Sequence, residues 1–150
     1  TVISEFDGIS YQQDGDVHFD PNKVMVHKDG NLSPALILLH ELGHAYNYHK
    51  DEKNFIKRWL AKIRFYDNEE EKWVITRIEN PAAKKVGQVV RKDHTIKAMK
   101  EAISPTSPVT KEERDRKIAA SRRRTEIENK KITDALEDLD NQSIVKRKGL

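Results

Sequence analysis

Two histidines and a glutamate stand in the order H-E-x-x-H within the stretch LILLHELGHAYNYH, as His40, Glu41 and His44. Residues four apart lie on one face of a helix, so both imidazoles can direct a nitrogen at the same ion. Glu41 lies beside them and can reach a water molecule that the ion binds. Zinc lowers the pKa of such a water towards neutrality, and a carboxylate can then take its proton and pass it to a leaving amine. The pattern therefore predicts a zinc site formed by His40 and His44, with Glu41 as the general base.

The alternative interpretation is a helix whose two histidines only pack or form hydrogen bonds. A chance match to the motif is expected in roughly one per cent of chains of similar length. Both histidines also belong to the most apolar segment of the sequence. Burying them there with a carboxylate is costly without a metal ion or many hydrogen bonds, so the metal site is the favoured interpretation.

A catalytic zinc needs three protein ligands and an open position, and a chain without cysteine must supply them from histidine, aspartate or glutamate. The longer motif H-E-x-x-H-x-x-G-x-x-H fails, because Asn47 and Lys50 replace its glycine and its last histidine. A glutamate from a second helix is the remaining common solution. Glu70 or Glu71, in the stretch DNEEEKW, is expected to be this ligand, and Glu79 is a less favoured alternative.

The fold class expected to position these residues is α+β, a small zincin-like domain. Alternating residues around Asp14-Gly15 predict an N-terminal β-hairpin within residues 9–27, including a further short strand at 24–26. Ser33 followed by Pro34 is typical of a helix start. The apolar segment 35–48 that follows should be the buried central helix, which carries the H-E-x-x-H motif.

Three further helices are expected in the first part of the chain. The apolar stripe of residues 53–66 predicts one, and the glutamate-bearing helix should end before Asn80-Pro81, because a residue before proline is pushed away from helical geometry. A short helix at 82–86 should be closed by Gly87.

The charged C-terminal part of the chain is expected to be a separate segment. The stretch SPTSPVT predicts a linker, and Thr110 with Glu113 forms a capping box for a last helix. We therefore predict a metallopeptidase domain at residues 1–103 and a linker with a charged helical arm at 104–150. The formal net charge of +3 lies in this arm, but basic and acidic residues are interleaved there, so nucleic-acid binding is not expected.

The composition also limits the class of protein. The longest apolar run, 35–39, is far shorter than the roughly 20 residues of a membrane-spanning helix, so no membrane span is expected. No secretory signal is visible. Because the chain begins at Thr1, we expect a fragment or a processed domain of a longer protein.

The order of these motifs resembles the NleD-type zinc metallopeptidase effectors, a family of bacterial type III secreted effectors and related toxin domains. The resemblance covers roughly residues 8–95. The matching pieces are H-E-L-x-H-A-Y from His40 to Tyr46, E-E-x-x-V-I-T from Glu70 to Thr76, E-N-P from Glu79 to Pro81, and G-x-x-x-R-x-D-H from Gly87 to His94.

The resemblance implies a zinc endopeptidase that a bacterium secretes and delivers into the cytoplasm of a target cell. Members of the family cut host signalling proteins such as MAP kinases. It also implies that His40 and His44 bind zinc, that Glu41 is the base, and that Glu70 or Glu71 is the third ligand. The expected partners are a protein substrate in the target cell and an immunity or chaperone protein.

The G-x-x-x-R-x-D-H piece is expected to lie near the cleft. His94 or Arg91 could stabilise the oxyanion of the tetrahedral intermediate. Two alternatives stay open, in which Asp93 orients a zinc-binding histidine or the group only fixes a turn. The substrate is expected to bind as a strand along the edge of the N-terminal hairpin.

Two other functions remain compatible with the sequence. One is a non-proteolytic, zinc-stabilised module that binds a protein through the charged C-terminal helix, although a structural zinc needs no base in the position of Glu41. The other is an intracellular processing peptidase that cuts a repressor with the same active site.

Overall fold

The computed structural model of the chain describes residues 2–5, 11–13 and 15–148, and its fold is α+β, as predicted. It divides into two compact units, Thr1–Glu112 and Glu113–Leu150, which are described separately below.

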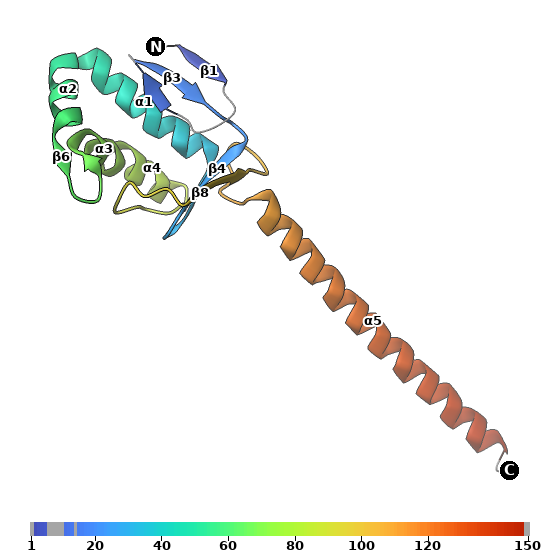
Figure 1. Ribbon diagram of the computed structural model, residues 1–150. Helices are drawn as coiled ribbons and strands as arrows, with labels where there is room; N and C mark the ends of the chain where they lie inside the picture. Colours follow the sequence, from blue (N-terminus) through green and yellow to red (C-terminus); the bar gives the residue numbers. More distant parts are fainter. Residues whose placement is uncertain (1, 6–10, 14, 149–150) are drawn as a thin grey trace. The chain divides into compact units, whose positions relative to one another are not determined.

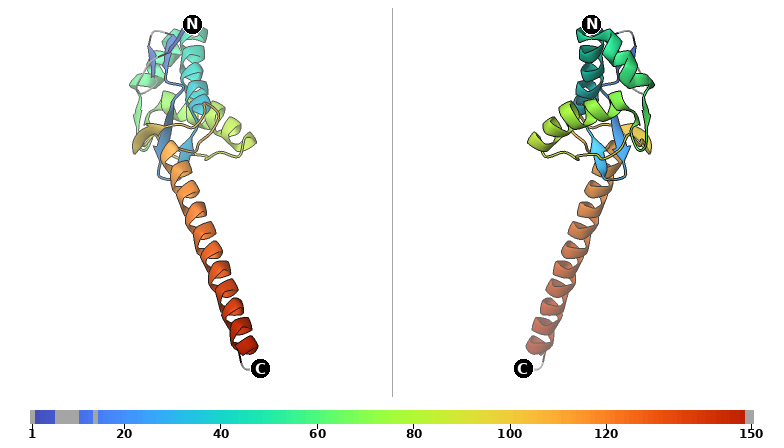
Figure 2. Two further views of the ribbon diagram at one scale, coloured as in Figure 1. Left: turned by 90° about the vertical axis from the view of Figure 1, so that its right-hand side faces the viewer. Right: turned by 90° about the vertical axis from the view of Figure 1, so that its left-hand side faces the viewer.

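Helix α1, Pro34–Lys50, is the central element of the first unit. It contacts strands β2 and β3 as well as α2, α3 and η1, so the N-terminal strands and the later helices flank it on different sides (Figures 1 and 2). Ser33 is its N-cap, because its Oγ accepts a hydrogen bond from the Leu36 N–H at 3.4 Å, and Pro34 occupies the first turn. The predicted central helix is therefore confirmed.

The first unit contains two three-stranded sheets. The first has the order β1-β3-β2, with β2 and β3 antiparallel. Gln13 pairs with Asp16, which confirms the predicted hairpin, although Asp14 itself lies outside the described residues. The second sheet has the order β5-β4-β8. The strands are β1 Ile3–Glu5, β2 Tyr11–Gln13, β3 Asp16–Phe19, β4 Lys23–His27, β5 Gly30–Leu32 and β8 Ala98–Glu101.

Helix α2, Glu52–Leu60, ends earlier than the predicted helix 53–66. The chain instead forms a short hairpin in which β6, Lys62–Ile63, pairs with β7, Asp67–Asn68. Phe65 and Asp67 adopt positive φ angles of 75° and 65°, which a helix cannot contain. The predicted helix 53–66 was therefore wrong beyond Leu60. After the hairpin, Asn68 caps the following helix, α3.

Helix α3, Glu69–Val74, continues through the π-helix η1, Ile75–Glu79, into α4, Asn80–Lys85. The predicted end before Asn80-Pro81 was therefore wrong. Asn80 donates its N–H to the carbonyl of Ile75, five residues back, and stays helical with φ −61° and ψ −40°. The wider π turn accommodates Pro81, which lacks an N–H and would crowd a regular α-helix. As predicted, the last turn is closed by Gly87, at φ 68°.

The buried aliphatic cluster of the first unit is small. It joins α1 to the second sheet and to α4, and its members are Met25, Leu32, Leu36, Ile37 and Ala83. Small size is what the polar composition requires, because 36% of the residues are hydrophobic and 35% are charged.

The segment 104–110 packs on the first unit, where the sequence predicted a linker. The backbone carbonyl of Pro105 accepts a hydrogen bond from the Ala35 N–H at 2.8 Å, and the carbonyl of Pro108 accepts one from Asn31 Nδ2 at 3.0 Å. Ala102 forms a bridge with Thr110. These contacts move the end of the first unit from residue 103 to Glu112.

Helix α5, Lys111–Lys148, begins directly after Thr110, as the capping box predicts, and from Glu113 onward it forms the described part of the second unit. Its side chains from Lys111 to Leu139 are exposed. None of the helices in the described part of the chain combines the length and the apolar character needed to cross a bilayer.

Candidate metal centre

The two motif histidines and one glutamate converge in the first unit. The Nε2 atoms of His40 and His44 lie 3.0 Å apart. Glu71 Oε2 lies 3.1 Å from His40 Nε2 and 3.3 Å from His44 Nε2. All three side chains are buried, and we call them the metal group. The structure thus places Glu71, from α3, beside the two histidines of α1.

Two local features bring α3 close enough to α1. Asn68 caps α3 by accepting the Glu71 N–H at 2.9 Å on its side-chain oxygen, which fixes the first turn that carries the glutamates. Gly43 lies on α1 where α3 and η1 pass. A Cβ at this position would lie 2.9 Å from both Val74 Cγ1 and Ile78 Cδ1. The absence of a side chain at Gly43 therefore permits the approach of the two helices.

The metal group has the chemistry of a metal-binding site. Two imidazole nitrogens and one carboxylate oxygen form a donor set that divalent zinc accepts. Ligands about 2.0–2.1 Å from a tetrahedral ion lie about 3.3 Å from one another, close to the three separations observed. Glu71 Oε2 is buried and has no hydrogen bond to any described residue. A cation would satisfy this oxygen, so the group could hold a metal ion.

Electrostatics in the metal-free group favour a positive charge. Burial alone would raise the pKa of Glu71, but the nearby imidazoles of His40 and His44 hold it well below its usual range. Burial lowers the pKa of His40, but the nearby carboxylates of Glu71 and Glu79 outweigh this effect and raise it to about 9. The carboxylates therefore attract positive charge to this point, as a cation site requires.

A buried ion pair lies behind His40. Glu79 Oε2 lies 2.9 Å from His40 Nδ1. Arg91 donates from Nε to Glu79 Oε1 at 2.6 Å and from Nη2 to Glu79 Oε2. With its proton on Nδ1 facing Glu79, His40 leaves the Nε2 lone pair free for an ion. Glu79 is therefore not in the metal group but contacts one of its members, His40.

This arrangement corrects the predicted role of Arg91. The guanidinium is fully buried and pairs with both oxygens of Glu79, on the side of His40 away from the metal group. It cannot reach a substrate carbonyl from there. Arg91 was expected to stabilise an oxyanion, whereas in the structure its guanidinium pairs with Glu79.

Glu70 likewise lies next to the metal group without joining it. Its Oε1 accepts a hydrogen bond from Asn47 Nδ2 at 2.6 Å, and its Oε2 accepts one from Arg58 Nε. Glu70 Oε1 also lies 3.5 Å from His44 Nδ1, the atom of that ring that faces away from the group. Of the two glutamates that the sequence left open, the structure brings Glu71 to the histidines and places Glu70 behind His44.

Glu41 has a carboxylate available for proton transfer. The residue is 8% exposed, and its carboxylate accepts no hydrogen bond from the residues that the structure describes. Burial raises the pKa of Glu41, and the nearby His40 and His44 oppose this effect. A carboxylate beside a metal group that is not used as a ligand fits the predicted general base.

His94 lies on the solvent-exposed side of the metal group. Its Nε2 lies 3.3 Å from Glu71 Oε2, and its Nδ1 lies 2.7 Å from Asp67 Oδ2. The neighbouring Asp93 instead accepts a hydrogen bond from His27 Nε2 at 2.9 Å and pairs with Lys28. Asp93 therefore orients no member of the metal group, which answers one of the open alternatives. His94 and Arg91 are the residues of this motif that contact the group, and Arg91 Nη2 lies 3.3 Å from His40 Nδ1.

Several residues of the site had no signal in the sequence. Asn47 and Arg58 hold Glu70, and Trp59 contacts the ring of His44 with centroids 5.9 Å apart. Asp67 binds His94 from a hairpin that was predicted as helix. Their separation from the motif along the chain hides their proximity, although Asn47 follows His44 by one helical turn.

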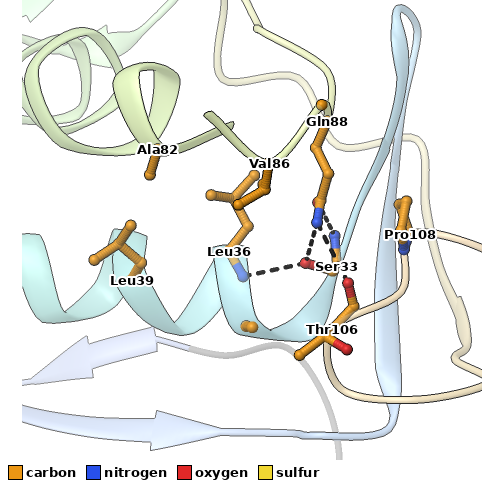
Figure 3. A pocket seen from close by; sticks show the side chains of 10 residues that line it. Ser33, Leu36, Leu39, Ala82, Val86, Gln88, Thr106 and Pro108 are labelled. Atoms are coloured by element: carbon orange, nitrogen blue, oxygen red, sulfur yellow. Dashed lines mark hydrogen bonds between the residues drawn. The ribbon is translucent and has the colours of Figure 1, made fainter. Parts of the chain in front are cut away.

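A second concave region lies at the N-terminal end of α1, with a volume of about 370 Å³ (Figure 3). Leu36, Leu39, Ala82 and Val86 form an apolar wall, and Gln88 closes one side by hydrogen-bonding to Ser33. No titratable side chain lines this cavity. Its apolar wall can accept an apolar group.

Comparison with protein-family models, with curated proteins and with solved structures gives no match to this chain.

Proposed function

We propose that this protein is a zinc-dependent endopeptidase with a zincin-like fold. One observation carries the proposal: the H-E-x-x-H helix and Glu71 form a buried metal group, and Glu41 lies beside it with no hydrogen bond to its carboxylate from the described residues. A structural metal site has no use for such a carboxylate, whereas hydrolysis of a peptide bond requires a base there.

Zinc is the ion that fits this donor set best, because two imidazoles and one carboxylate with room for a substrate are typical of catalytic zinc sites. When bound, zinc would polarise a peptide carbonyl and acidify a water molecule. His40, His44 and Glu71 would hold it, with Glu79 and Glu70 orienting the two histidines.

Two side chains would then take part in the reaction directly. Glu41 removes the proton of the attacking water and delivers it to the nitrogen of the leaving amine. His94 lies on the exposed side of the metal group, where Nε2–H can donate to the developing oxyanion while Nδ1–H donates to Asp67. The substrate would bind as an extended strand along the edge strand β2, which contacts α1.

The biological setting that we propose rests on the resemblance to NleD-type effectors. In this setting, a bacterium secretes the protein, and it cleaves a protein substrate in the cytoplasm of a target cell as an effector or toxin. An immunity or chaperone protein would protect the producing cell, and the exposed helix α5 is a surface that such a partner could bind.

The proposal is tested with Glu41→Gln, which keeps the size of the side chain and removes the base. Native protein and variant are loaded with zinc and incubated with target-cell lysate, and new protein N-termini are counted by mass spectrometry. The variant should retain zinc and lose at least about 100-fold in cleavage rate, the usual contribution of a general base. Glu69→Gln is the matched control, because Glu69 is an exposed glutamate of the same cluster.

Equal cleavage by native protein and Glu41→Gln would refute the role of the base. If neither protein cleaves while both are stabilised by zinc, the endopeptidase proposal fails. The remaining candidate is then a zinc-stabilised interaction module that uses α5.

A further inference from the structure

Two exposed aromatic residues belong to segments that contact residues at the metal group. Trp59 of α2 is 40% exposed, and its ring meets that of His44 edge to face, at 84°. Phe65, in the hairpin between β6 and β7, is 63% exposed. Its backbone carbonyl accepts a hydrogen bond from the His94 N–H at 2.8 Å. We call Trp59 and Phe65 the apolar rim.

The position of Phe65 is held against a local conformational cost. Its φ of 75° lies in the left-handed region, where a bulky residue is an outlier and a glycine is not. The hydrogen bond from His94 and the pairing of Ile63 with Asp67 hold the backbone there. The Arg64 guanidinium lies over the ring, 4.7 Å from its centroid. A strained, exposed aromatic residue beside a reactive group is typical of a binding site, because the strain persists only where the surrounding contacts maintain it.

We propose that the apolar rim binds a large apolar side chain of the substrate, aromatic or aliphatic, from a residue next to the scissile bond. This inference rests on the proposed endopeptidase function. A peptide held at the metal group lies beside both His44 and His94. The ring of His44 meets that of Trp59, and the backbone N–H of His94 donates to the carbonyl of Phe65, which keeps the Phe65 hairpin beside His94. A side chain that leaves water for two aromatic surfaces gains affinity in proportion to the apolar area it covers.

The occupant of the rim is tested by binding, without any need for catalysis. The probes are acetohydroxamate and 3-phenylpropanohydroxamate, which share a zinc-binding head and differ in an aromatic extension. Their affinities for the zinc-loaded full chain are measured by calorimetry. The phenyl compound should bind at least about tenfold more tightly, because its ring covers apolar surface at the rim.

Phe65→Gly is the decisive variant, because glycine accepts the positive φ and the fold should keep its thermal stability. It should reduce the preference for the phenyl compound to less than about threefold. Phe65→Leu, which restores an apolar side chain, should recover part of the preference. Val86→Ala is the control, since Val86 is equally exposed and lines the separate cavity at the start of α1.

Each other outcome has a distinct meaning. An undiminished preference in Phe65→Gly, or its loss in Val86→Ala, would overturn the proposal, and the second result would assign the apolar subsite to the cavity. If light scattering shows that the native chain self-associates and Phe65→Gly does not, a second copy covers the rim and the proposal is wrong. If the phenyl preference depends on Phe65 but no protein is cleaved, the apolar rim is confirmed as a binding site and the endopeptidase function is refuted.

Discussion

Glu70 and Glu71 are adjacent in the sequence, yet they contact different partners. Glu71 Oε2 lies between the Nε2 atoms of His40 and His44, whereas Glu70 receives hydrogen bonds from Asn47 and Arg58. The two residues therefore offer a matched comparison of the proposed metal ligand, Glu71, with a residue that only contacts His44, Glu70.

Glu71→Ala should lower the zinc affinity by at least about 100-fold, because it removes one of three ligands. Glu70→Ala should lower it by about tenfold, since the loss acts only through the orientation of His44. A competition titration with a chromophoric chelator measures both affinities. A larger loss in Glu70→Ala than in Glu71→Ala would show that the ligand has been assigned to the wrong residue.

Substitutions in the pair formed by Glu79 and Arg91 should change the stability of the protein and its zinc affinity differently. Glu79→Gln should destabilise the metal-free protein by about 3–5 kcal/mol, because it leaves the buried Arg91 charge without its partner. The double variant Glu79→Gln, Arg91→Met should recover much of this stability, since neither charge remains. Urea unfolding in the presence of a chelator measures both changes.

Zinc affinity should stay about tenfold or more below the native value in the double variant, because His40 Nδ1 still lacks its carboxylate. Recovery of full zinc affinity together with stability would contradict the positioning role. Glu79 would then be only a counter-ion for Arg91.

The sequence predicts His40, Glu41 and His44 because the spacing along one helix alone sets their geometry. It could not separate Glu70 from Glu71, since both lie in the first turn of α3 and the packing of α3 against α1 decides which one meets the histidines. The same limit explains why the burial of Arg91 was not predicted. Arg91 is buried through a contact with Glu79, and no local pattern reveals this contact.

At the scale of elements, the site depends on how closely α1 and the continuous helix from α3 to α4 approach one another. Gly43 lies at this crossing, and both atoms that a Cβ would meet belong to Val74 and Ile78. Val74 is fully buried and branched at Cβ, so it has little freedom to move away.

Gly43→Ala should therefore destabilise the protein by about 1–3 kcal/mol through overpacking, although alanine is the better helix former. Zinc affinity should fall as well, because Glu71 moves away from α1 with its helix. Val74→Ala in the Gly43→Ala background should recover part of both losses by making space. Thermal unfolding with and without zinc measures the effects, and a Gly43→Ala variant more stable than the native protein would contradict the close approach.

Prediction of the elements succeeded where local chemistry was strong. Ser33-Pro34 and the apolar run after them placed α1, and Gly87 marked the end of α4. It failed where tertiary contacts override local preference. The π turn allows the helix to pass Pro81, and the hairpin at Phe65 replaces the last turns of the expected second helix.

At the scale of the whole molecule, the chain separates a unit that contains the complete candidate site from an exposed helix. Every residue of the metal group and of its supporting contacts precedes residue 113, the start of the second unit. The side chains of α5 from Lys111 to Leu139 are exposed. We therefore expect α5 to contribute little to the stability of the first unit.

Truncation after Glu112 should shift the melting temperature of the zinc-loaded protein by less than about 2 °C, which corresponds to under about 0.5 kcal/mol. Zinc stoichiometry should not change. Differential scanning calorimetry of the two chains at equal concentration makes the comparison. A decrease of more than about 8 °C would show that α5 supports the first unit. Truncation after Ser104 is the contrasting variant, because it removes residues that pack against Ala35 and Asn31 and should destabilise the unit.

At this scale the sequence predicted the two-part organisation but placed the boundary too early. Proline and serine in SPTSPVT are typical of a linker, and nothing local indicates that Pro105 and Pro108 offer carbonyls to the start of α1 and to β5. Strand β8 was missed for a related reason, because its pairing partner β4 lies more than seventy residues earlier in the chain.

The claim that this protein is a zinc endopeptidase is tested most directly by titrating the metal-free protein with zinc while measuring cleavage of target-cell proteins. The account predicts that cleavage rises in proportion to bound zinc, reaches its maximum at one zinc per chain, and stays at background in Glu41→Gln carrying the same zinc. A native protein that binds a full equivalent of zinc and produces no more new N-termini than Glu41→Gln would contradict it.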